Sequence, residues 1–280
     1  MAKKQEVVTA NRNAVSRGGG ALSFLKEGYK SEGAGLPNKP DDFLIPMAKV
    51  LGPQSPEVLK GNANQYKGAE AGDIMIKNAP DPLIKANVGF LFQPCFRDEA
   101  VIEWLARGKG GGGGSGFVAR HPADYIDSGK AKRVPDPNNR DRLIWINEKT
   151  GNSLTHTRYV SGYMIREDGP PMPLVLPFSS TGHTVAKSWN MMMASQRFPD
   201  DQETPVDIWL VYYLVTTRMR QRADQTWYIF DISQAGKENG KPLFVPTLQD
   251  AERGKSLHQS LSRKEKDIDV AGQASDDDTM

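Results

Sequence analysis

The chain has 280 residues, of which 38% are hydrophobic and 25% are charged. This composition is typical of a folded protein with an apolar core, and it excludes a wholly disordered chain. Lysine and arginine number 36 against 34 aspartates and glutamates, so the formal charge of +2 indicates neither an anionic nor a cationic partner. The sequence has no run of eighteen apolar residues and no apolar segment behind its first lysines. These features predict a soluble, cytoplasmic protein with no membrane partner.

Both ends of the sequence carry patterned charge and few apolar residues. Residues 1–40 hold seven lysines and arginines against three glutamates, which predicts a disordered basic arm. Residues 251–280 predict a disordered tail that is first basic and then acidic, with aspartates at Asp267, Asp269, Asp276, Asp277 and Asp278. Residues 41–250 are expected to form the core. The glycine-rich stretch 108–116 predicts a long, flexible insertion loop.

The core sequence predicts strands and one clear helix. Alternating apolar residues and turn signals place strands at 87–96, 142–147, 156–166, 173–178, 207–220 and 226–232. The helix follows Ser179, Ser180 and Thr181 as candidate caps, and its apolar stripe is Val185, Trp189, Met192 and Met193. The single cysteine, Cys95, lies among phenylalanines and is expected to be a buried thiol.

Without the short strand 173–178, the order of these elements is three strands, a helix and two strands, which is typical of the OB-fold. We therefore expect a mainly β, α+β protein built on an OB-fold-like five-stranded Greek-key barrel with one bridging helix. In that fold, the face of the second and third strands and its flanking loops bind oligonucleotides or oligosaccharides. The sequence leaves open whether residues 41–86 belong to the barrel or form a separate cover.

Searches for catalytic and metal-binding patterns end without a site. Lys109 precedes the glycine run instead of following it, so the run does not match a phosphate-binding P-loop. Ser115 lacks the second glycine of a nucleophile elbow, and the four histidines are scattered. His121 and Asp124 are interpreted as residues of a surface loop. We expect a protein that is not an enzyme and needs neither a metal nor another cofactor.

Aromatic and basic residues alternate on the predicted strands, which favours single-stranded nucleic acid. Such proteins stack bases on aromatic rings and neutralise phosphates with lysine and arginine. The candidates for stacking are Trp145, Tyr159, Tyr163 and Trp227, and those for phosphate contact are Arg158, Arg166, Arg218, Arg220 and Arg222. The alternative is that the rings fill the core and that the arginines form a solvated hairpin tip. Trp189 and at least one of Tyr212 and Tyr213 are interpreted as core residues.

Several short motifs resemble a known group of proteins. Asp41 to Pro46, Ser55 to Val58, Gly72 to Ile74, Leu176 to Thr181, Trp189-Asn190 and Trp227-Tyr228 are similar to bacteriophage proteins of replication and recombination gene clusters, among them single-stranded DNA-binding proteins. The aspartates at 276–278 resemble the acidic C-termini of bacterial and phage single-stranded DNA-binding proteins. Those tails commonly end in an aromatic residue, whereas this chain ends in Thr279 and Met280.

The sequence thus predicts a phage protein that coats single-stranded DNA during replication or recombination, with little preference for base sequence. Its acidic tail is expected to compete with DNA for the binding groove and to recruit partner proteins. DNA as opposed to RNA, self-association and strand annealing stay open. A phage assembly protein with charged tails is the first alternative, and a nucleic-acid-processing enzyme is the second.

Overall fold

The computed structural model describes residues 45–76, 79, 82–105, 116–137, 139–198, 201–223, 225–235 and 242–263. The predicted basic arm, most of the glycine run and the acidic tail lie outside the described residues. The described residues include the α-helices α2 (Gly182–Ala194) and α3 (Leu248–Arg263). They also include the 3-10 turns η3 (Ala123–Ile126) and η4 (Ile208–Leu210). The strands are β1 (Ala48–Val50), β2 (Ile74–Ile76), β3 (Leu83–Ile84), β4 (Phe90–Trp104), β5 (Phe117–Pro122), β6 (Ala131–Asp136), β7 (Asn139–Asn147), β8 (Ser153–Ile165), β9 (Met172–Ser179), β10 (Arg197–Phe198), β11 (Asp201–Pro205), β12 (Val211–Arg222), β13 (Gln225–Gln234) and β14 (Leu243–Phe244).

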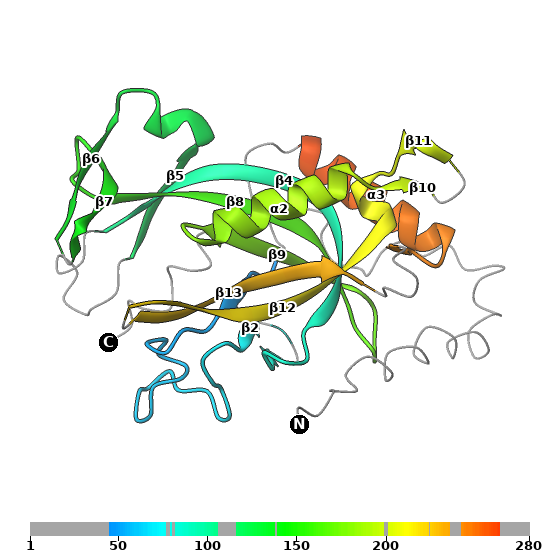
Figure 1. Ribbon diagram of the computed structural model, residues 1–280, viewed down its shortest axis with the longest axis horizontal. Coiled ribbons are helices and arrows are strands. Elements are labelled where there is room, and N and C mark those ends of the chain that lie inside the picture. Colours follow the sequence, from blue (N-terminus) through cyan, green and yellow to red (C-terminus); the bar gives the residue numbers. More distant parts are fainter. Residues whose placement is uncertain are drawn as a thin grey trace, which may run out of the picture.

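The fold is mainly β, as the sequence predicted, and it centres on one antiparallel sheet of nine strands. The sheet runs β13-β12-β4-β8-β7-β6, and β14, β5 and β9 pair with β12, β4 and β8. The two longest strands, β4 and β8, lie side by side through most of their length. The edge of β8 that faces away from β4 pairs with two strands in turn. Ser153 and Leu154 pair with β7, and Thr157 to Met164 pair with β9. In Figure 1, β5–β7 and the turn between β12 and β13 lie towards one end of the long axis, and α3 lies towards the other.

The sheet does not close into the expected five-stranded barrel. No described residue of β9 is paired with β13, so the sheet is open between these two strands. β1 contacts both β9 and β13 in this gap, and α2 packs against the same two strands. Short strands β1, β2 and β3 form a separate sheet whose Ala48, Ile74 and Ile76 enter the main core. The described part of 45–86 therefore contributes to the core, and β1 lies at the open edge.

A bulge in β4 explains why this strand is longer than the sequence predicted. Proline has no N–H to donate to the ladder and is rare inside paired strands, so a strand that continues past Pro94 is unusual. The strand continues, and its pairing with β8 shifts between Pro94 and Phe96. Such a bulge inserts an extra residue and bends the strand, and here the extra residue is Cys95. The prediction of a buried thiol is confirmed, and burial raises the pKa of Cys95 to about 12 despite the opposing charge of Arg253.

The main core is filled from α2 and the inner face of the sheet. Val185, Trp189 and Met193 of the predicted helical stripe are buried, and Met192 packs at the margin. Trp189 contacts Phe92 and Tyr213 with ring centroids 6.0 and 5.5 Å apart. The helix follows Thr181, as expected, although the side chain of Thr181 makes no capping hydrogen bond. The prediction that Trp189 and at least one of the two tyrosines lie in the core is thus confirmed.

The C-terminal boundary of the core was predicted too early. The sequence placed the start of a disordered tail at residue 251, but residues 248–263 form α3. The backbone N–H of Asp250 donates to Thr247 Oγ1, and Thr247 Oγ1 donates in turn to the Asp250 carboxylate. Thr247 is therefore the N-cap of α3: its hydroxyl oxygen satisfies one free N–H of the first turn and marks where the helix begins. No helix within the described ranges is long and apolar enough to span a bilayer.

Candidate nucleic-acid interface

The hairpin of β12 and β13 carries a row of exposed arginines. Arg218, Arg220 and Arg222, called here the arginine row, are all exposed and occupy alternate positions of β12. Alternate residues of a strand point to the same face, so the three guanidinium groups share one side of the hairpin. Asp231 lies 3.4 Å from Arg218 across the hairpin, and both side chains are about two-fifths exposed. An ion pair this exposed is weak and leaves the row strongly cationic.

Trp227 belongs to the same face of the hairpin. It lies directly opposite Arg220 in the β12–β13 register, and opposite residues of an antiparallel pair point the same way. Its ring is partly buried against the main core. Its indole N–H is buried and finds no hydrogen-bond partner among the described residues. The structure therefore brings together four predicted site residues, the arginine row and Trp227.

The predicted residues of β8 have partners within the chain. Arg158 is paired with Glu99, with Nε and Oε1 2.9 Å apart. Tyr159 is only 2% exposed and packs with Ala100, Ile102 and Val175 beneath Ile45 and Met47. The guanidinium of Arg120 lies 5.6 Å from its ring centre. Tyr159 is thus covered on the outer face of β8 and offers no free ring to a base in this state.

Tyr163, Arg166 and Trp145 lie in three other surroundings. Tyr163, further along β8, is partly buried, and the guanidinium of Arg253 from α3 lies 5.2 Å from its ring centre. Arg166 follows the end of β8 and is partly exposed. Trp145 stands on β7 beneath Arg133, whose guanidinium is 5.6 Å from its ring. The acidic-tail candidates lie outside the described residues.

A buried carboxylate organises the extension formed by β5–β7. Glu103 near the end of β4 is 2% exposed, and its two oxygens accept four hydrogen bonds. The donors are His121 Nε2 (2.7 Å), Asn147 Nδ2 (2.8 Å), Asn152 Nδ2 (2.8 Å) and Thr150 Oγ1 (2.6 Å). Burial alone raises the pKa of a carboxyl, but these bonds outweigh it and lower the pKa of Glu103 to about 2.

This network was missed in the sequence because its members are far apart along the chain. His121 was interpreted as a surface-loop residue, whereas it lies on β5 and stacks on Tyr125 with ring centres 3.9 Å apart. The network ties β5 and the β7–β8 turn to β4. The described residues contain no group of three or more potential metal ligands.

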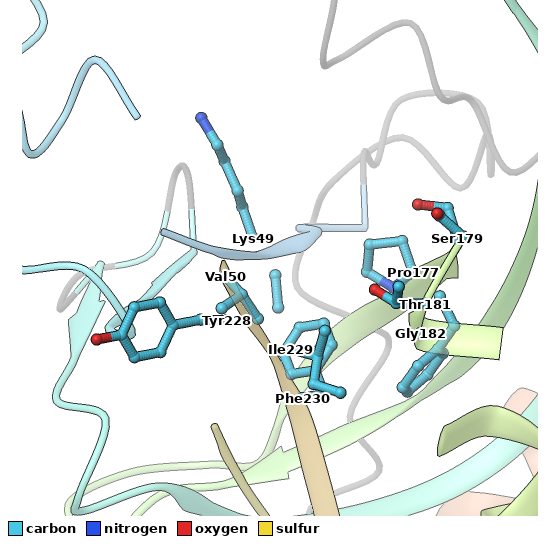
Figure 2. Close-up of a pocket in the computed structure, with 12 residues that line it drawn as sticks. Lys49, Val50, Pro177, Ser179, Thr181, Gly182, Tyr228, Ile229 and Phe230 are labelled. Atoms are coloured by element: carbon cyan, nitrogen blue, oxygen red, sulfur yellow. The ribbon is translucent and has the colours of Figure 1, made fainter. Parts of the chain in front are cut away.

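A shallow pocket of about 270 Å³ marks the open edge of the sheet. Figure 2 shows Lys49 and Val50 of β1, Pro177 to Gly182 at the junction of β9 and α2, and Tyr228 to Phe230 of β13 around it. The Lys49 ammonium is paired with Glu57, with Nζ and Oε1 2.8 Å apart. The pocket adjoins the hairpin through β13, but its lysine is already neutralised.

The structure thus defines a mainly β protein with an open sheet, a cationic hairpin and a helix packed on one end. A family model described as "Pam3 phage gp34-like protein" matches residues 16–266. The chain belongs to this family, whose description indicates a bacteriophage origin. No curated protein and no solved structure matches the chain.

Proposed function

We propose that this phage protein binds single-stranded DNA and that the arginine row is its primary phosphate contact. The observation that carries the proposal is the placement of Arg218, Arg220 and Arg222, exposed on one face of a hairpin, with the ring of Trp227 opposite Arg220. Charge and an adjacent aromatic ring are the two elements of sequence-tolerant binding to single strands. The protein would coat DNA in the host cytoplasm during replication or recombination.

The pairing order of the sheet supports an OB-like ancestry for the site. Numbered one to five along the chain, β4, β8, β9, β12 and β13 pair in the order 3-2-1-4-5. This is the order of an OB barrel opened between its third and fifth strands. In that fold, the loops after the first and fourth strands flank the binding face. Here these connections are the β5–β7 extension and the turn that carries the arginine row.

A titration tests the proposal. Fluorescence of the five tryptophans is followed while oligo-dT, or a duplex of equal length, is added at several salt concentrations. We expect quenching by the single strand, with an affinity that falls steeply as salt rises. Absence of binding to oligo-dT would overturn the proposal, and formation of large closed particles without DNA would favour an assembly protein instead.

The triple variant R218A/R220A/R222A isolates the arginine row. Each phosphate contact to a single strand contributes about −0.7 to the slope of log K against log salt. Loss of three contacts should therefore make that slope shallower by about 2 and weaken binding at low salt. The charge-matched control K60A/K67A/K187A removes three exposed lysines that lie on neither β12 nor β13. Equal losses in the two variants would show that the row has no special role.

A further inference from the structure

Four aromatic side chains lie together beneath α3. They are Phe96, Tyr163, Trp209 and Tyr212, called here the aromatic platform. The ring of His258 lies 4.7 Å from that of Trp209 and 6.0 Å from that of Phe96. The guanidinium of Arg253 lies 5.2 Å from the ring of Tyr163, and its charge also acts on the hydroxyl group of Tyr212. The platform is thus contacted by two planar, nitrogen-rich groups of α3.

The attachment of α3 combines partial apolar burial with polar contacts. Ala251, Leu257 and Leu261 are half-buried. Gly254 is the one buried residue between 248 and 262, the part of α3 whose side chains the structure describes. A Cβ at position 254 would stand 2.7 Å from Trp209 Cβ, so glycine permits the close approach. Two hydrogen bonds also connect α3 to β4. His258 Nδ1 lies 2.7 Å from the carbonyl oxygen of Cys95, and Gln93 Nε2 donates to the carbonyl oxygen of Asp250 (2.9 Å).

These contacts between α3 and the sheet would allow a ligand to replace the helix. Among residues 248–262, α3 has no fully buried large apolar side chain, unlike α2. It therefore has less hydrophobic stabilisation to lose when it leaves the sheet, and a ligand that covers the same rings restores part of that loss. Planar groups over aromatic rings are also what nucleic-acid bases offer, because each base has a π-face that stacks on such rings. Gln93 is 0% exposed beneath the helix, and its amide keeps the carbonyl oxygen of Trp209 as a partner at 2.8 Å when α3 leaves.

We propose that the aromatic platform is a second contact for single-stranded nucleic acid, occupied here by Arg253 and His258 in place of bases. α3 is its displaceable cover, and the strand replaces it on the sheet. This inference rests on the proposed function. The apparent dissociation constant equals the intrinsic one divided by the fraction of molecules in which the platform is open, so a looser cover strengthens binding.

The double variant R253A/H258A tests the proposal by the sign of its effect. Loss of both contacts should open the platform and tighten binding to oligo-dT about tenfold. The control K255A removes an equal charge from an exposed position of the same helix, and it should leave the affinity unchanged or weaken it. Purely electrostatic attraction predicts weaker binding for both variants. An unchanged or weaker affinity of R253A/H258A would therefore overturn the proposal.

Hydrogen exchange of the unaltered protein gives an independent readout. Amides of 248–263 should exchange faster when oligo-dT is bound, because α3 leaves the sheet. Unchanged or slower exchange of these amides would overturn the displacement. The two proposals fail differently: if oligo-dT binds and the arginine-row variant weakens it, but R253A/H258A does not strengthen it, only the platform is refuted. Thermal unfolding of R253A/H258A confirms that the variant is folded.

Discussion

At the scale of single residues, Glu103 is the most consequential side chain that the sequence did not reveal. Its pKa of about 2 lies below the ordinary value of 4.5, so folding favours its ionised form. The resulting stabilisation is complete above about pH 4.5 and is lost as the pH falls towards 2. At 1.36 kcal/mol per pKa unit, it is worth about 3 kcal/mol. We expect Glu103→Gln to lower the free energy of unfolding by about that amount at pH 7 and by little near pH 2.

Urea unfolding between pH 2 and pH 7 measures this difference. Glu148→Gln is the matched control, because Glu148 is exposed in the turn after β7. Its free energy of unfolding should follow that of the unaltered protein at every pH. If Glu103→Gln lost the same stability at pH 2.5 as at pH 7, the effect would come from packing and not from the ionised carboxylate.

The residue scale also shows how far alternation along a strand can predict a site. Alternation in the sequence placed Arg218, Arg220 and Arg222 together, because two-residue spacing fixes the face of a strand. It did not show that Tyr159 would be covered, because Ile45 and Met47 reach it from far away in the sequence. Burial by a distant segment has no local signature. The contact of Arg253 with Tyr163 could not be predicted either, because these two residues are also far apart in the sequence.

At the scale of elements, the strands with strong apolar alternation and the helix α2 were predicted, and the others were not. Strands β5 and β6 carry mostly polar or partly exposed residues, so their pairing and not their sequence defines them. The helix α3 did have a local signal, the N-cap residue Thr247 followed three residues later by Asp250, which the charge pattern of the tail obscured. Charged composition alone therefore does not predict disorder.

The central pair of strands depends on one glycine. A Cβ at Gly162 of β8 would stand 2.0 Å from the carbonyl oxygen of Gln93 on β4 and 2.8 Å from the ring of Phe92. Neither the Gln93 backbone nor the buried Phe92 ring can move aside without disturbing the packing of the core. We therefore expect Gly162→Ala to lower the free energy of unfolding by about 2 to 3 kcal/mol. Chemical denaturation measures the loss. Gly52→Ala is the control, since its nearest neighbour would be Ser55 Oγ at 3.9 Å, and a similar loss there would refute the steric explanation.

At the scale of the whole molecule, charge is separated along the sequence although the total is only +2. Seven lysines and arginines lie in residues 1–40 and three more in the arginine row, whereas five aspartates gather in residues 267–280. A tethered polyanion competes with DNA phosphates for the same cations at high effective concentration. Deletion of residues 267–280 should therefore tighten binding to oligo-dT at low salt, on the order of tenfold, and by less at high salt.

A variant with all five tail aspartates changed to asparagine separates charge from chain length. It keeps every residue position but removes the negative charge, so its affinity for oligo-dT should match that of the deletion. If only the deletion tightened binding, the tail would act by excluding volume and not by competing for cations. If neither change altered the affinity at low salt, competition by the tail would be refuted. The affinity would then depend on the sheet, the hairpin and the cover formed by α3.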